Sequence, residues 1–181
     1  MADGTLKVGT ITTSSGSGTI TIGQSGETVT IPSGVTLTNN GTASGFGKVL
    51  QVITATDSTA RSTTSTSFVT ASNTLSVNIT PSSTSSKILI TASFEAGTNS
   101  GARGFWTIYK DSTNLGAANG MFSAFSSAGS LDGSSGSLTF LDSPSSISAL
   151  TYAVYMKTNG TSCSMNGNTV KGSIVVMEIA G

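Results

Sequence analysis

The chain has 181 residues, a length that favours one domain or one domain with a short appendage. It carries 8 basic and 8 acidic residues, no His and one Cys, and only 9% of its residues are charged. These numbers exclude a His/Cys metal site, a Ser-His-Asp or Cys-His nucleophile and a disulfide within the chain, and the neutral balance argues against nucleic-acid binding.

Ser, Thr and Gly make up nearly half of the chain, a composition found in disordered linkers and in all-β proteins. Thr is interleaved with Val and Ile, and Pro occurs three times. We therefore predict an all-β fold, because β-branched residues favour strands and disordered segments are poor in them. Residues 1–7 lack the apolar segment of a signal peptide. No apolar run approaches the roughly 20 residues of a spanning helix, so we expect synthesis in the cytoplasm and no membrane insertion.

Residues 1–45 contain no aromatic residue and are repetitive. Short apolar alternations, each followed by a Gly, Ser or Pro turn, recur there at a spacing of about nine residues that then shortens. Such a unit buries little alone, so repeats stack or several chains wrap together. The segment predicts an intertwined β-shaft, or a flexible linker as the alternative. The expected shaft core comprises Ile11, Ile20, Ile22, Val29, Ile31, Val35 and Leu37.

Residues 46–181 contain every Phe, Tyr and Trp and alternate between apolar and polar positions. About eight to ten strands are predicted, which indicates a β-sandwich. The clearest are 75–80, 87–95, 105–110, 138–141, 150–157 and 173–179. Segments 105–110 and 173–179 are apolar on both faces, so they need cover from a subunit interface or from loops of the same chain. Candidates for this interface or core are Phe105, Trp106, Ile108, Ile174 and Val176.

Several motifs together resemble a known family. They are 1–8, 31–37, 47–52, 75–81 running into 85–90, 141–144 before Tyr152, and 176–180. This combination resembles small fibre and tail-fibre-like virion structural proteins of marine and cyanobacterial tailed phages, and it covers nearly the whole chain.

The resemblance implies a homotrimer in the virion. Residues 46–181 are expected to form a jelly-roll head similar to the trimeric heads of the C1q and tumour necrosis factor type. Residues 1–45 are expected to be a shaft or an anchor to other virion proteins of the capsid or tail. Host-surface binding, to a glycan or a protein, is the expected purpose. Because 181 residues is short for a tail fibre, a capsid decoration or head-fibre protein is the alternative.

No catalytic, cofactor-binding or metal-binding residue is predicted. Asp57, Asp111, Asp132 and Asp142 fall in predicted turns, where an Asp side chain caps backbone amides. A polysaccharide depolymerase, which needs two acids across a cleft, is the less favoured alternative.

Other segments have two interpretations each. Trp106 is a sugar-stacking residue or, given its apolar neighbours, a core residue. Residues 117–125 are an adaptable contact surface or an ordinary strand and loop. The Gly/Ser-rich segments 98–104 and 129–136 are predicted to be exposed loops available for host contacts. Cys163 lacks a basic neighbour and is predicted to be a buried filler.

Overall fold

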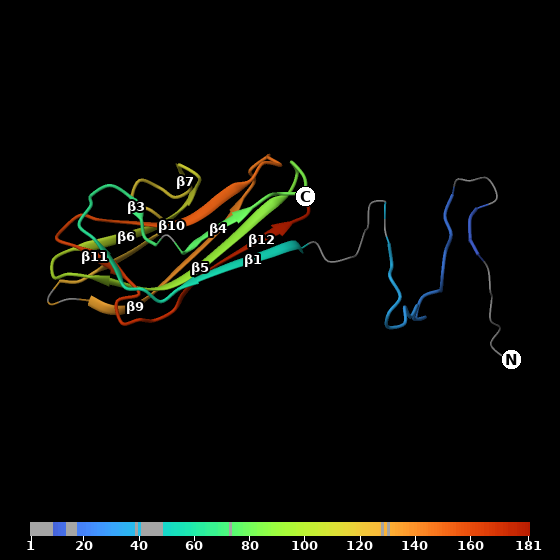
Figure 1. The fold of residues 1–181 in the computed structure, drawn as a ribbon, viewed down its shortest axis with the longest axis horizontal. Helices are drawn as coiled ribbons and strands as arrows, with labels where there is room; N and C mark the ends of the chain where they lie inside the picture. The colour runs from blue at the N-terminus through green and yellow to red at the C-terminus, as the bar shows by residue number, and fades with distance from the viewer. Residues whose placement is uncertain are drawn as a thin grey trace. The chain divides into compact units, whose positions relative to one another are not determined.

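The computed structural model describes residues 9–13, 18–38, 40, 49–72, 74–127, 129 and 131–181. The chain divides into two compact units, Met1–Gly45 and Phe46–Gly181. The described residues of the second unit form twelve β-strands and no helix (Figure 1), which confirms the predicted all-β fold.

The strands form two antiparallel sheets. Sheet A contains β1 (Val49–Asp57), β2 (Arg61–Thr63), β5 (Lys87–Thr98), β9 (Leu131–Asp142), β11 (Cys163–Met165) and β12 (Gly172–Ile179). Sheet B contains β3 (Val69–Thr70), β4 (Ser76–Ile79), β6 (Arg103–Lys110), β7 (Thr113–Asn114), β8 (Phe122–Phe125) and β10 (Leu150–Thr158). In sheet A, β12 pairs with β1 on one edge and β5 on the other, and β9 pairs with the far edge of β5. The arrangement is compatible with the jelly-roll-like β-sandwich that the sequence predicts.

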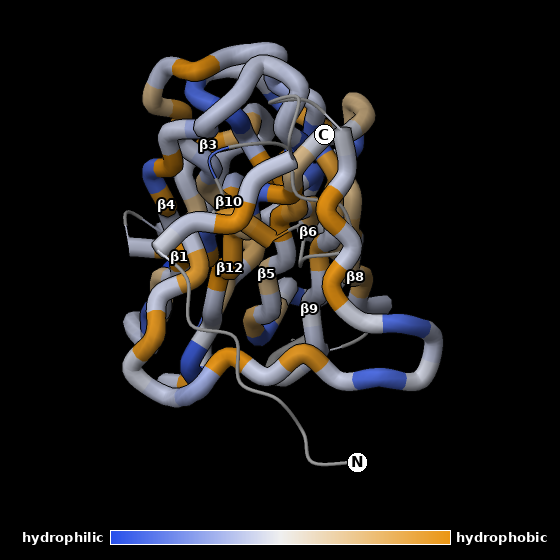
Figure 2. Tube along the Cα trace, turned by 90° about the vertical axis from the view of Figure 1, so that its right-hand side faces the viewer, coloured by the Kyte–Doolittle hydropathy of each residue, from blue (hydrophilic) through white to orange (hydrophobic). Residues whose placement is uncertain are grey.

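The core lies between the two sheets, because every second side chain of a strand points to the same face. On β5, Ile88, Ile90 and Ala92 are buried, and Leu89 and Thr91 between them are only partly buried. The same alternation of buried and partly buried residues runs along β12. Figure 2 colours the chain by the hydropathy of each residue. Burial of these apolar faces against one another supplies the main favourable free energy of the fold.

Aromatic rings fill one part of this core. Trp106 has no exposed surface, and its ring centroid lies 5.9 Å from that of Phe94 and 5.6 Å from that of Phe122. All five candidates for interface or core are at most 7% exposed within the single chain: Phe105, Trp106, Ile108, Ile174 and Val176. Trp106 is therefore a core residue within the single chain. The alternative, that its ring stacks on a sugar, is wrong.

Segment 129–136 is not the loop that its composition predicts. Strand β9 begins at Leu131, and Ser134 and Gly136 pair with Ala96 and Phe94 of β5. A Cβ at position 136 would overlap the Phe94 ring. The glycine therefore makes room for a cross-strand aromatic ring rather than marking a turn. The second expected loop, 98–104, is also shorter, since its ends belong to β5 and β6.

The described residues of the first unit contain no strand, so the short strands expected within residues 1–45 are not formed in the single chain. Two turns are closed there, by Glu27 N–H to the Gln24 carbonyl at 3.0 Å and by Val35 N–H to the Pro32 carbonyl at 3.2 Å. The expected shaft-core residues are 43–68% exposed: Ile11, Ile20, Ile22, Val29, Ile31, Val35 and Leu37. A lone strand cannot satisfy its backbone groups, and the described residues of the first unit pair with no neighbouring strand.

Candidate functional site

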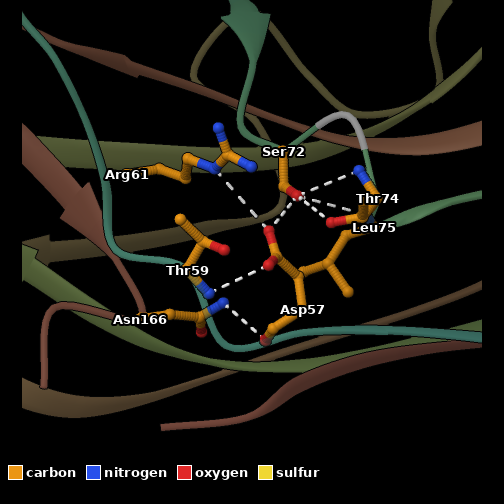
Figure 3. Close-up of polar contacts among 7 residues, drawn as sticks. All are labelled: Asp57, Thr59, Arg61, Ser72, Thr74, Leu75 and Asn166. Carbon is orange, nitrogen blue, oxygen red and sulfur yellow. Dashed lines mark hydrogen bonds and ion pairs between the residues drawn. The ribbon is translucent and has the colours of Figure 1, made fainter. Parts of the chain in front are cut away.

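A cluster of bonded polar groups surrounds Asp57 at the end of β1 (Figure 3). Its carboxylate is 7% exposed and accepts hydrogen bonds from the Ser72 hydroxyl and from the Thr59 N–H, the latter at 2.9 Å. The Asn166 amide donates to the Asp57 carbonyl at 3.0 Å, and Arg61 Nε lies 3.7 Å from the carboxylate. The cluster therefore ties the end of β1 to segments far away in the sequence.

The charge of Asp57 is stabilised by its hydrogen bonds, as in a structural junction that joins the end of β1 to other segments. The hydrogen bond from Ser72 holds the pKa of the Asp57 carboxyl well below its usual range, although burial opposes this. Ser72 Oγ also accepts the N–H groups of Thr74 at 3.1 Å and Leu75 at 3.2 Å. A carboxylate of such low basicity is a poor general base.

We expect Asp57→Asn to lower the free energy of unfolding by about 2 kcal/mol, because a charged acceptor of buried hydrogen bonds is lost. Urea unfolding at neutral pH measures this change. Asp111→Asn is the matched control, because Asp111 is exposed and accepts one hydrogen bond, from Thr151 N–H at 2.9 Å. Equal losses in the two variants would contradict the junction role.

A second buried carboxylate, Asp142 on β9, joins the two sheets. It accepts a hydrogen bond from the Tyr152 hydroxyl of β10 at 2.7 Å and pairs with Lys110 Nζ of β6 at 2.9 Å. Burial, followed by the contact with Asp142, raises the pKa of Tyr152 above its usual range. Both donors bind the same Asp142 oxygen, so this carboxylate also connects β9 to strands of the other sheet.

Glu178 on β12 is the third such acid and is 1% exposed. Its carboxylate accepts hydrogen bonds from Ser82 N–H at 2.7 Å, Ser82 Oγ at 2.6 Å, Ser86 Oγ at 2.7 Å and Gln51 Nε2 at 2.6 Å. Burial opposes ionisation, but the donors outweigh it and lower the pKa of Glu178 from 4.5 to about 2. Sequence reasoning missed this site, because the alternation of β12 shows that residue 178 points inward but not which donors meet it.

The acids predicted to lie in turns divide as follows. Asp111 lies in a turn, Asp57 and Asp142 end strands, and Asp132 lies within β9, where the turn prediction is wrong. The side chain of Asp132 lies outside the described residues. Among the residues that the structure describes, no three His, Cys, Asp or Glu side chains gather where they would hold a metal ion.

The outer face of sheet A carries an apolar row across four strands. Val52 of β1 pairs with Met177 of β12, Met177 pairs with Leu89 of β5, and Leu89 pairs with Leu141 of β9. Val52 is 53% exposed and Leu141 is 48% exposed. We call these four residues the apolar row.

The surroundings of the apolar row are nearly uncharged. The next registered row along the strands consists of Thr54, Val175, Thr91 and Thr139. Among the outward side chains that the structure describes on these four strands, Lys87 is the only exposed charge. A contiguous apolar face with so little charge is typical of a surface that another protein covers.

A hollow of about 640 Å³ lies farther along sheet A. Ser93, Glu95, Ser137, Asn168 and Lys171 are among its lining residues. The Asn168 side chain and backbone N–H donate to the two Glu95 oxygens at 2.5 and 3.3 Å. The carboxylate is thus already bonded within the chain, and the rest of the lining combines serine hydroxyls with the apolar side chains of Phe94 and Val170.

The outer face of sheet B is aromatic, which sequence reasoning did not single out. Tyr109 of β6 and Tyr155 of β10 stack with centroids 3.9 Å apart, and Phe68 lies 6.2 Å from Tyr109. Lys157 Nζ lies 4.7 Å from the Phe68 centroid. The available signal was the presence of Tyr at outward positions of two predicted strands.

Cys163 is 1% exposed, and burial raises the pKa of its thiol to about 11. It is the buried filler that the sequence predicts. In the described part of the chain, no helix has the length and apolar character needed to cross a membrane. The sequence matches no protein-family model and no curated protein. Function is therefore inferred from the surfaces described above.

Proposed function

We propose that this chain is a non-enzymatic virion structural protein that assembles as a homotrimer. Residues 46–181 form the β-sandwich head, which binds the host surface. Residues 1–45 form the shaft or the segment that anchors the head to other virion proteins. The motifs that resemble phage fibre proteins support the virion setting.

The apolar row on sheet A is the observation that carries the proposal. Isolated exposed apolar residues are ordinary, but a registered row across β1, β12, β5 and β9 is a continuous surface. Covering it contributes about 25 cal/mol for each Å² of apolar surface removed from water. Around a threefold axis, each copy of the chain can cover the apolar row of its neighbour.

The first unit supports a trimer. Its aliphatic side chains are exposed in one chain, and each short segment has one apolar face. Three such faces around an axis enclose one another and give each backbone a partner. This accounts for the absence of strands among its described residues in the single chain.

Four carboxylates are buried among the described residues, and three of them support a non-enzymatic role. Asp57, Asp142 and Glu178 each accept hydrogen bonds from groups of the fold. They hold strands together rather than facing a common cleft in which a substrate would react.

Mass measurement of the purified protein tests the assembly. At micromolar concentration, mass photometry is expected to give three times the chain mass of 18.0 kDa. Met177→Glu places a charge in the apolar row and is expected to yield monomers that retain the circular dichroism of the sandwich. Ile147→Glu is the control, since Ile147 is 61% exposed outside this face.

A monomeric wild-type protein would contradict this assembly, and a trimeric Met177→Glu variant would contradict the role of the apolar row in it. Cryo-electron microscopy of the particle then locates the protein. Density at tail-fibre positions agrees with host attachment, and threefold density on the capsid lattice indicates a decoration protein instead. Absence from the particle would overturn the virion role.

A further inference from the structure

A hollow of about 370 Å³ opens on the outer face of sheet B, beside β6 and β8. Its lining residues are Arg103, Phe105, Asn119, Gly120, Met121, Phe122 and Ser123. Its volume is at the lower end of the range of about 300–1,000 Å³ for small-molecule sites. The proposed assembly uses the outer face of the opposite sheet, so it leaves this hollow open.

Two cations border the hollow. The Arg103 guanidinium donates to Ser123 Oγ at 3.3 Å and lies 5.0 Å from the Phe125 ring centroid. Lys157 Nζ lies 5.4 Å from the Phe105 centroid and donates to the Ala118 carbonyl at 2.6 Å.

Neither cation has an acidic partner within the described residues. The two ion pairs found there join Arg61 to Asp57 and Lys110 to Asp142. No carboxylate lines the hollow. Two partly buried cations without an anion make this surface complementary to a negatively charged ligand.

The loop that completes the hollow is held in place. Gly120 N–H donates to the Ala117 carbonyl at 2.8 Å, and the φ of Gly120 is 75°. A Cβ on Gly120 would lie 3.1 Å from Phe68 Cζ, so the turn packs closely on the sheet. Asn119, exposed next to this glycine, is therefore presented by a fixed turn.

Aromatic side chains also lie at the hollow. Phe125 is 48% exposed beside Arg103, and Phe122 lines the hollow. Aromatic rings next to amide and hydroxyl groups suit a sugar ring, which has an apolar face and a polar edge. An acidic peptide uses the cations but needs no such platform.

We propose that this hollow binds an acidic saccharide of the host surface. Arg103 and Lys157 neutralise the acidic group, the Asn119 amide bonds a ring hydroxyl, and the Phe125 ring stacks on the apolar face of the sugar. The inference rests on the proposed host-surface role, and it adds the ligand class and the site.

Calorimetric titration of the full chain tests the site. The probes are tetragalacturonic acid, sialyllactose and a chondroitin sulfate tetrasaccharide, with the methyl ester of tetragalacturonic acid and lactose as neutral counterparts. At least one acidic probe is expected to bind about tenfold or more tightly than its neutral counterpart, because its charge accepts charge-assisted hydrogen bonds. Arg103→Gln is expected to remove this preference. Lys87→Gln, which removes a cation from sheet A, is expected to keep it.

Several results would overturn the proposal. One is that no acidic probe binds, or that the neutral counterparts bind equally well. Another is that Arg103→Gln binds as the wild type does. A third is that pentaglutamate binds more tightly than the saccharides. If Arg103→Gln does not fold, Asn119→Ala replaces it, since Asn119 is exposed, and it is expected to weaken binding several-fold. The monomeric Met177→Glu variant retains the hollow. Its titration therefore separates failure of the site from failure of the proposed assembly.

Discussion

Replacing Trp106 by alanine is expected to lower the free energy of unfolding of the sandwich by about 4 kcal/mol. The Trp106 side chain has no exposed surface and packs between Phe94 and Phe122 on the core side of β6. Alanine leaves a cavity that neighbouring rings cannot fill without moving strands. Urea unfolding followed by far-ultraviolet circular dichroism measures the loss, because the substitution removes the only Trp.

Trp106→Phe is the matched variant. The indole Nε1 of Trp106 is buried without a hydrogen-bond partner, so Phe removes an unsatisfied donor as well as some volume. We expect Trp106→Phe to cost less than half of the alanine loss. A Trp106→Ala protein destabilised by under about 1 kcal/mol would contradict the central packing role of this ring.

Acidification is expected to destabilise the head through Glu178. The folded protein holds the pKa of Glu178 at about 2, below its ordinary value of 4.5. The stabilisation is therefore fully present above pH 4.5 and is lost as the pH falls from 4.5 towards 2. The pKa difference corresponds to about 3 kcal/mol. Urea unfolding at a series of pH values between 2 and 7 measures it.

Glu178→Gln identifies the group responsible. It removes the titrating carboxyl and weakens the bonds from Ser82, Ser86 and Gln51, so we expect a loss of about 2–4 kcal/mol at pH 7 and a flatter pH profile below 4.5. Glu27→Gln is the control, because Glu27 is exposed in the first unit. A Glu178→Gln profile as steep as that of the wild type would assign the acid sensitivity to other carboxyls.

Apolar alternation predicted the main strands of the sandwich. Segments 75–80, 87–95 and 150–157 correspond to β4, β5 and β10. A period of two is a local property, so it is readable in the sequence when one face is buried. The first half of β9 was missed because its Ser and Gly residues resemble a loop. The small residue Gly136 leaves room for the Phe94 ring on the neighbouring strand, and that strand is not adjacent in sequence.

The surfaces were less predictable than the strands. The sequence indicates that 173–179 is apolar on both faces, but the apolar row depends on the register that places Met177 between Val52 and Leu89. The hollow beside β6 and β8 was missed for the same reason. Residues 117–125 were recognised as a contact surface or a strand and loop, whereas Arg103 and Lys157 reach it from other strands.

The position of β12 between β1 and β5 has a consequence for biogenesis. Residues 49–57 pair with residues 172–179, so the middle of sheet A closes only after more than a hundred further residues have been translated. At about 5–20 residues per second, β1 waits several seconds or longer for its partner. Such non-local pairing is also slow to form. During that interval the newly made strands present unpaired edges, which are sites where other chains can pair and aggregate.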